Sequence, residues 1–350
     1  MKNSAFEQDL GNRDEEIREW LQSVIGAGHR TELASGDASF RRYLRVYGSG
    51  PACILMDAPP ERESCLPFAR VQSLLRAADV NVPEIIEADF DRGLILLSDL
   101  GPRCYLDVLD ERNCDALYGD AVKTLHRMQT GVAPDAVPDF DRQELLRELN
   151  LFVDWFIGRH LGIEASGELR EVMDACFEAL VERCLEQPQV FVHRDYHSRN
   201  LMHVATANPG VLDFQDAVRG PVTYDLVSLF RDVYIKWPGS RVETWVKDHY
   251  ARIRSDLDGL GAVSADSFVR WFDLTGVQRH IKVAGIFCRL WYRDAKPGYL
   301  NDIPLTLSYL MEVGRRYPET RHLAEMLSSL DVMSRLETAN RKVCAAPTAG

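Results

Sequence analysis

Hydrophobic residues recur along this chain with two different periods. Up to about residue 100, short apolar runs bounded by Gly, Pro and Asp alternate with turns, at residues 29–33, 40–47, 53–57, 83–88 and 94–98. Runs of this length and setting are typical of β-strands. Apolar residues at helical spacing predict one helix after Asn12, ending at Gly26, and another within residues 59–77. We therefore expect a small antiparallel sheet accompanied by two helices.

Beyond Gly101-Pro102 the apolar residues recur every three or four positions. This period predicts helices over residues 117–125, 145–156, 169–184 and 265–292. Two short apolar runs, at 190–192 and 211–212, interrupt the helices and are expected to be strands. Residues 337–350 show no such period, so we expect them to be loosely ordered. Because Gly-Pro breaks regular structure, we divide the chain into lobes at residues 1–100 and 101–350.

Polar side chains with a specific spacing follow the two short strands. The sequence FVHRDYHSRNLMHV begins at Phe191, and GVLDF begins at Gly210. Asp195 follows the first strand, Asn200 comes five residues later, and Asp213 follows the second strand. Phosphoryl transfer requires a carboxylate that orients and deprotonates the accepting hydroxyl, and a carboxylate and an amide oxygen that hold Mg²⁺ on the nucleotide phosphates. These three residues supply those groups in that order.

These segments resemble the aminoglycoside phosphotransferase family, the small-molecule branch of the protein-kinase-like fold. The resemblance spans roughly residues 30–235 and rests on HRDYHSRNLM, from residue 193, and VLDFQDAVRGPVTYDLVSL, from residue 211. It implies that Asp195 is the catalytic residue, that Asn200 and Asp213 bind Mg²⁺, and that Asp225 and His193 are structural. It also implies an α+β bilobal fold with a nucleotide-binding lobe, 1–100, and a mainly helical lobe for catalysis and acceptor binding, 101–350.

Within this family the chain is most similar to anomeric kinases that phosphorylate N-acetylmuramate or N-acetylglucosamine during recycling of the bacterial cell wall. The additional segments that carry this likeness are MDAPPERE, from residue 56, and LILLSDLG, from residue 94. The likeness implies ATP and Mg²⁺ as cofactors and an amino sugar as the acceptor. A kinase for an aminoglycoside, choline or an amino alcohol would share the same catalytic residues, and only an acceptor screen separates these alternatives.

The polar loop at residues 35–39 lies where kinase-like folds cover the nucleotide phosphates. Small residues let backbone N–H groups approach phosphate oxygens, so we expect Ser35, Gly36 and Ser39 to contact the nucleotide. The loop lacks a G-x-G-x-x-G pattern, and an ordinary hairpin turn would look similar. Arg41 and Arg42 are further candidates for phosphate binding, although consecutive residues of a strand point in opposite directions.

The third expected strand departs from the family pattern. Family members carry a phosphate-binding Lys there, whereas the corresponding position here is Met56. Either Arg41 or Arg42 replaces this charge, or Mg²⁺ and the backbone hold the nucleotide. A non-catalytic nucleotide-binding regulator is a third alternative, which the presence of the complete catalytic trio disfavours. The following interlobe hinge is expected to bind the adenine edge through Leu97, Ser98, Asp99 and Leu100.

Candidates for acceptor binding lie around the catalytic loop and on the helix expected over 265–292. His197 and Arg199 could each contact substrate or face solvent. Asp216 could bind a sugar hydroxyl or a second metal, or cap a helix. Arg279, together with His280 and Lys282, could bind the lactate carboxylate of a sugar, and a charged helix face would show the same pattern. A metal-dependent hydrolase is a further alternative, because His193, Asp195 and His197 alternate in sequence.

Composition narrows the range of partners. The 350 residues include 41 basic and 53 acidic side chains, giving a net charge of −12, which argues against nucleic acid or an anionic membrane as a partner. The eight cysteines form no C-x-x-C pair, as expected of reduced thiols. The N-terminal residues are too charged for a signal peptide, and no apolar run approaches the length of a membrane span. We expect a cytoplasmic monomer.

Overall fold

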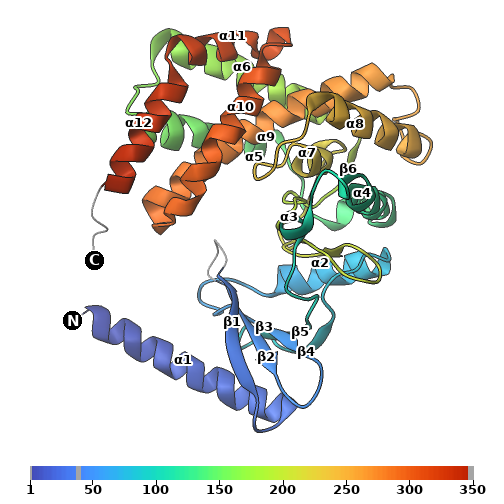
Figure 1. Ribbon diagram of the computed structural model, residues 1–350, viewed down its shortest axis with the longest axis vertical. Coiled ribbons are helices and arrows are strands. Elements are labelled where there is room, and N and C mark those ends of the chain that lie inside the picture. The colour runs from blue at the N-terminus through green and yellow to red at the C-terminus, as the bar shows by residue number, and fades with distance from the viewer. Residues whose placement is uncertain (1, 37–40, 346–350) are drawn as a thin grey trace.

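The computed structural model describes residues 2–36 and 41–345, and it has two lobes (Figure 1). The N-terminal lobe is built on an antiparallel sheet of five strands in the order β1-β2-β3-β5-β4. The strands are β1 (Arg30–Gly36), β2 (Arg42–Tyr47), β3 (Cys53–Asp57), β4 (Ile85–Asp89) and β5 (Leu94–Ser98). The predicted small antiparallel sheet is thereby confirmed, and β3 and β5 have the predicted bounds.

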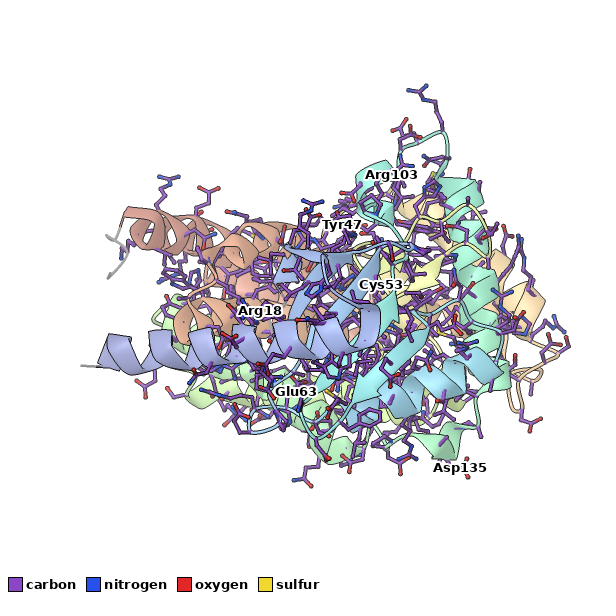
Figure 2. All side chains as sticks on the ribbon, turned by 90° about the horizontal axis from the view of Figure 1, so that it is seen from below. Arg18, Tyr47, Cys53, Glu63, Arg103 and Asp135 are labelled. Carbon is purple, nitrogen blue, oxygen red and sulfur yellow. The ribbon has the colours of Figure 1, made fainter. Side chains whose placement is uncertain are left out.

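Two helices accompany this sheet, one of them packed across its outer face. Helix α1 (Lys2–Ile25) crosses one face of the sheet (Figure 2), where alternate residues of β2, β3 and β5 meet it. The contact buries an apolar cluster of Ile17, Trp20, Leu21, Val46, Leu55, Leu94 and Leu96. The opposite face carries Met56 and Ile95 into the main core, together with α2 (Leu66–Ala77). The second helix therefore lies within residues 59–77, as predicted, and begins at Leu66.

The C-terminal lobe is mainly helical and is organised around the long helix α9 (Ala265–Asp294). Five helices pack against it: α5 (Arg142–Leu151), α6 (Gly167–Leu185), α7 (Tyr224–Phe230), α8 (Gly239–Ile253) and α10 (Ile303–Gly314). The approach to α5 is close at Gly285, where a Cβ atom would lie 2.4 Å from the backbone carbon of Leu151. The lobe also contains α3 (Tyr105–Val108), α4 (Cys114–Gly131), α11 (Pro318–Ser329) and α12 (Val332–Ala345).

Four short strands lie between α6 and α7 and carry the loops that are predicted to be catalytic. Strand β6 (Gln189–Val192) pairs with β9 (Val218–Pro221), and β7 (Leu201–Met202) pairs with β8 (Gly210–Val211). The strand expected at 190–192 is confirmed as part of β6. The strand expected at 211–212 includes only Val211, because β8 ends at that residue. The loops after β6 and β8 contain the predicted catalytic residues.

Two predictions about the helices need correction. The single helix expected over 145–156 is α5 followed by a π-helical segment, η2 (Phe152–His160). Residues 337–345 are helical rather than loosely ordered, because α12 buries Val332 and Leu336 against the neighbouring helices. The remaining short turns are the 3₁₀ segments η1 (Pro134–Ala136) and η3 (Pro297–Asp302).

The lobe boundary placed at residues 100 and 101 stays a prediction, and it falls in the connection between β5 and α3. Over the described residues, no helix combines the length and the apolar character that crossing a membrane requires.

Candidate active site

His193 fixes the loop that follows β6. Its side chain is buried, its Nε2 donates to the carbonyl of Leu212 at 2.9 Å, and its Nδ1 accepts from the backbone N–H of Asp195 at 3.3 Å. Burial lowers the pKa of His193 to about 4, so the ring is neutral at neutral pH. Because both ring nitrogens are occupied, His193 ties the loop after β6 to the loop after β8 and is not placed to bind a metal.

Asp225 supports the same loop from α7. Its buried carboxylate accepts the backbone N–H groups of His193 at 2.7 Å and Arg194 at 3.0 Å. Burial raises the pKa of Asp225 to about 7, although these two N–H groups oppose the shift. Arg194 has a φ of 78°, an uncommon backbone conformation for a residue other than glycine. The loop is thus held in a strained shape by a buried acceptor beneath it.

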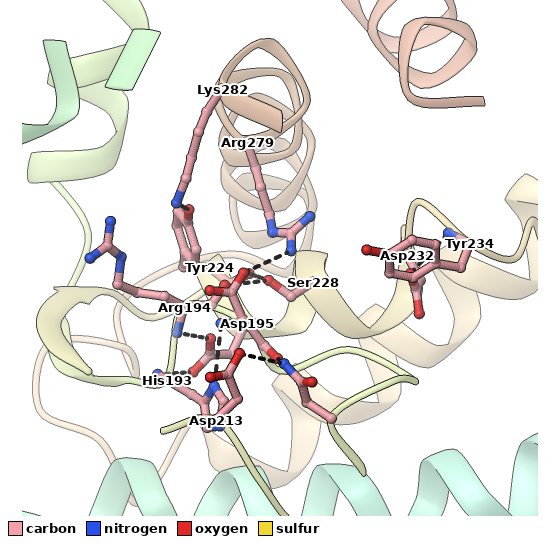
Figure 3. A network of polar contacts seen from close by, with 12 residues as sticks. His193, Arg194, Asp195, Asp213, Tyr224, Ser228, Asp232, Tyr234, Arg279 and Lys282 are labelled. Carbon is pink, nitrogen blue, oxygen red and sulfur yellow. Dashed lines mark hydrogen bonds and ion pairs between the residues drawn. The ribbon is translucent and has the colours of Figure 1, made fainter. Parts of the chain in front are cut away.

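The three predicted catalytic residues meet in space (Figure 3). Nδ2 of Asn200 donates to the backbone carbonyl of Asp195 at 3.0 Å and to Oδ2 of Asp213 at 3.2 Å. Oδ1 of Asp213 accepts from Gln215 at 2.8 Å, and Asp213 has a φ of 62°. Since Nδ2 makes both side-chain hydrogen bonds of Asn200, its Oδ1 is the atom suited to a cation. One carboxylate and one amide oxygen are hard ligands that fit Mg²⁺, which keeps several waters and phosphate oxygens.

Asp195 is surrounded by positive charge. Nη2 of Arg279 lies 3.7 Å from its Oδ1, and the Arg279 side chain is only 3% exposed, against 44% for Asp195 (Figure 3). Burial opposes ionisation, but the charges of Lys282, Arg279 and Arg194 outweigh it and hold the pKa of Asp195 well below its usual range. Asp195 is therefore a carboxylate that can accept a hydrogen bond from a bound hydroxyl.

A buried ionic cluster lies behind Asp195 and was not predicted. Glu148 of α5 pairs with Arg194 and, at 2.9 Å, with Nζ of Lys282. Lys282 also donates to the hydroxyl of Tyr224 at 3.0 Å. One feature of the sequence could have indicated this cluster. Glu148 lies on the apolar helix face of Leu145, Leu149 and Phe152, and a carboxylate on such a face requires a buried cationic partner.

A cavity of about 220 Å³ opens beside Asp195. Its wall includes three of the four predicted acceptor-binding residues, namely His197, Asp216 and Arg279. Arg199 instead lies over the ring of Tyr234, 3.6 Å from the ring centroid, and is exposed. The remaining lining residues are Arg147, Glu148, Leu151, Arg194, Val233, Tyr234, Lys282, Val283, Ile286, Phe287 and Arg289.

The alternative of a transition-metal site gains no support from the geometry. Within residues 2–36 and 41–345, no three His, Cys, Asp or Glu side chains gather closely enough to hold a metal ion. The ring of His197 packs edge-on against Tyr234, and burial lowers its pKa. His193 and His197 therefore contribute to the structure of the loop.

The two predicted phosphate-binding arginines, at the start of β2, have different partners. Arg42 pairs with Asp57 and with Asp14 of α1, on the sheet face that this helix covers. Arg41 is buried and pairs with Glu63. These partners agree with the expectation that the two arginines point in opposite directions. Because Arg42 faces α1, we assign the proposed phosphate binding to Arg41.

The other phosphate-loop candidates lie at the edge of the described residues. Ser35 and Gly36 end β1, where they are in register with Tyr43 and Arg42 of β2. Ser39 lies outside the described residues. Met56 is buried in the main core, so the position of the usual strand Lys contributes no charge here. Contacts of this loop with nucleotide stay a prediction.

The side chains of the expected hinge make structural contacts within the N-terminal lobe, and the hinge backbone is the part suited to binding adenine. The side chain of Leu97 is buried, Oγ of Ser98 accepts from the N–H of Glu84 at 2.8 Å, and Asp99 pairs with Arg45 at 2.6 Å. The N–H and C=O of Leu100, by contrast, bond to no other described residue. Adenine recognition by Leu100 thus stays a prediction that its backbone allows.

Comparison with known proteins agrees with this geometry. Residues 30–260 match the model of the phosphotransferase enzyme family. The chain belongs to this family. One relative, the N-acetylmuramate/N-acetylglucosamine kinase of Pseudomonas aeruginosa, is 47% identical over 85% of this chain and 87% of its own length. The protein of the same name from Pseudomonas putida is 45% identical over 89% of this chain and 91% of its own.

A solved member of the wider fold has the same architecture. The choline kinase of Streptococcus pneumoniae superposes with a TM-score of 0.60 over 86% of this chain and 99% of its own, at 12% sequence identity. At that identity the likeness shows the fold alone. The predicted kinase-like fold and the predicted class of small-molecule phosphotransferase are confirmed, while the roles of individual residues stay predictions.

Proposed function

We propose that this family member transfers the γ-phosphoryl group of ATP to the anomeric hydroxyl of N-acetylmuramate or N-acetylglucosamine, producing the sugar 1-phosphate. The names of relatives 45% and 47% identical over most of the chain support this acceptor. The observation that carries the proposal is the placement of Asp195, ionised and 44% exposed, at the wall of a cavity beside Asn200 and Asp213.

Asp195 would orient the anomeric hydroxyl and accept its proton. Phosphoryl transfer proceeds through a loose transition state with little demand for a strong base. An anomeric hydroxyl is more acidic than an ordinary alcohol, so a carboxylate with a low pKa is adequate. Arg279 and Lys282 keep Asp195 ionised, and the hydrogen bond from Asn200 to its backbone carbonyl holds the loop in position.

Asn200 and Asp213 would hold Mg²⁺ through Oδ1 of the amide and the carboxylate. When bound, the ion neutralises charge on the nucleotide phosphates. Arg41 would supply the positive charge that Met56 does not. The backbone of Leu100 would bind the adenine edge. We place the reaction in the cytoplasm, where ATP is available, and expect the protein to act as a monomer.

An acceptor screen tests this proposal. ADP release from MgATP is measured with N-acetylmuramate, N-acetylglucosamine, choline, ethanolamine and an aminoglycoside, with an Asp195→Asn variant as the control. We expect kcat/KM for at least one amino sugar to exceed that for every other acceptor by about 100-fold, equivalent to about 3 kcal/mol of transition-state stabilisation. Efficient release of ADP with choline or an aminoglycoside, and none with the amino sugars, would contradict the proposal.

A further inference from the structure

The cavity beside Asp195 extends along α9, well beyond the point where a reacting hydroxyl would bind. Arg279 and Arg289 both line the cavity and lie ten residues apart on this helix. At a rise of 1.5 Å per residue, their Cα atoms are roughly 15 Å apart. Val283 and Ile286 line the wall between them. The cavity therefore has a reacting end at Asp195 and a distal end at Arg289.

The distal end carries a positive charge that no carboxylate balances. Five cations line the cavity, and four of them pair with carboxylates: Arg279 with Asp195, Arg194 and Lys282 with Glu148, and Arg147 with Glu144. Arg289 makes no ion pair or hydrogen bond with any described residue, and its Nε is buried. A buried donor without a partner is costly unless a ligand satisfies it.

The neighbours of Arg289 increase this imbalance. Its pKa is lowered by burial and then by the charges of Arg293 and Arg147, which Asp294 and Glu148 offset incompletely. Arg293 and Arg147 both have carboxylate partners of their own. An anion bound at this end would therefore satisfy Arg289 without competing for an existing ion pair.

The chemistry of the two proposed acceptors differs at one substituent. N-acetylmuramate carries a lactyl ether with a carboxylate, and N-acetylglucosamine has a free hydroxyl in its place. The anomeric hydroxyl must reach Asp195, and a second carboxylate at that end would be repelled by it. The lactyl ether is carried on C3, two ring atoms from the anomeric carbon C1, so its carboxylate can extend away from Asp195 while the anomeric hydroxyl lies beside Asp195. This geometry favours Arg289 over Arg279 as its partner.

We propose that Arg289 binds the lactyl carboxylate of N-acetylmuramate and thereby sets the preference of this site between the two sugars. This inference rests on the proposed function. The planar guanidinium can accept a carboxylate through two parallel hydrogen bonds, which gives both strength and orientation. The neutral sugar would leave Arg289 unpaired and would bind through the contacts that the two acceptors share.

The test compares Arg289→Met, which removes the charge and keeps a long side chain, with Arg289→Lys, which keeps the charge. A hydrogen bond to a charged group corresponds to roughly a tenfold to hundredfold change in binding. We expect Arg289→Met to lower kcat/KM for N-acetylmuramate at least tenfold more than for N-acetylglucosamine, mainly through KM. Arg289→Lys should recover part of the selective loss, because a point charge remains.

The methyl ester of N-acetylmuramate provides a matched ligand that keeps the lactyl group and loses its charge. Wild-type protein should bind the ester at least tenfold more weakly than the acid, and Arg289→Met should bind the two with similar affinity, as a double-mutant cycle requires for a direct contact. Two results would overturn the assignment of Arg289 while leaving the proposed function intact. One is an equal loss of kcat/KM for both sugars in Arg289→Met, and the other is an Arg289→Met variant that still binds the acid more tightly than the ester. Wild-type protein that phosphorylates neither sugar would contradict the proposed function itself, and the assignment of Arg289 with it.

Discussion

Asn200 and Asp213, 13 residues apart in the chain, are joined by a hydrogen bond of 3.2 Å between Nδ2 and Oδ2. The same amide nitrogen donates to the backbone carbonyl of Asp195. One side chain therefore links the backbone at Asp195 to the carboxylate of Asp213. The two proposed tasks, metal binding by Asn200 and Asp213 and orientation of the acceptor by Asp195, fall on different side chains, so substitutions can test them independently.

Asp195→Asn should abolish most turnover and leave nucleotide binding intact. The amide keeps the shape of the side chain but cannot accept the proton of the acceptor hydroxyl. We expect kcat to fall by about 10²- to 10⁴-fold, the usual contribution of a general base, with an unchanged Kd for MgATP. Steady-state kinetics and calorimetric titration provide the two values. Turnover close to that of wild type would remove Asp195 from the mechanism.

Asp213→Asn should weaken nucleotide binding only in the presence of Mg²⁺. Loss of the carboxylate removes the charged ligand from the proposed metal site, and we expect the Kd for MgATP to rise by about tenfold or more. Asp266→Asn is the matched control, because it makes the same change in charge on a side chain that is 95% exposed and does not line the cavity. Calorimetry with MgATP, and with ATP in the presence of a chelator, measures the difference. Equal affinities for wild type and Asp213→Asn in Mg²⁺ would argue against the metal-ligand assignment.

Glu148→Gln should destabilise the C-terminal lobe. The substitution leaves Arg194 and Lys282 buried without their shared carboxylate, and breaking a buried ion pair in this way costs about 3–5 kcal/mol of unfolding free energy. Glu144→Gln on the same helix removes a partly exposed partner of Arg147, so it should cost less than about 1 kcal/mol. Urea denaturation measures both values, and similar losses in the two variants would show that the Glu148 cluster contributes little to stability.

His249 on α8 should make the fold sensitive to acid. Its buried ring has no partner among the described residues, and burial, with His126 and Arg252, lowers its pKa to about 3. In the unfolded chain the pKa of His249 is about 6.5, so between pH 3 and pH 6.5 the unfolded state binds more protons than the folded state. The contribution of the neutral His249 ring to stability is therefore complete above pH 6.5 and is lost as the pH falls.

A substitution of His249 isolates this contribution. If His249 takes up a proton in the unfolded state, with a pKa near 6.5, and stays neutral in the folded state, lowering the pH from 7 to 5 reduces the free energy of unfolding by about 2 kcal/mol. The free energy of unfolding of His249→Gln should therefore fall by about 2 kcal/mol less than that of wild type over this range. Denaturation curves at the two pH values measure the difference, and equal falls in the two proteins would show that His249 is not responsible.

The proximity of Asp195, Asn200 and Asp213 could be predicted because their geometry is local. Asp195 and Asn200 share one loop, and Asp213 follows the next strand pair, so the spacing of residues in sequence nearly fixes their distance in space. The strand at residues 53–57 was predictable for a similar reason, since an apolar run bounded by turn residues has few other structures available.

The pairing of Glu148 with Lys282 could not be predicted in the same way. These residues lie on α5 and α9, and only the packing of the two helices brings them together. The direction of Arg42 likewise depends on the register of β2 and on α1 covering one face of the sheet. The helix at Val332–Ala345 was missed because its apolar positions, beginning with Val332 and Leu336, are too few to stand out.

The most direct measurement of the central claim is phosphorus NMR of the protein with MgATP and either N-acetylmuramate or N-acetylglucosamine, with Asp195→Asn in parallel. The account predicts a new resonance of a sugar 1-phosphate, formed as the γ-phosphate resonance of ATP declines, in the wild-type sample alone. Phosphate transferred to another position of the sugar, or no transfer to either sugar by an active and folded protein, would contradict it.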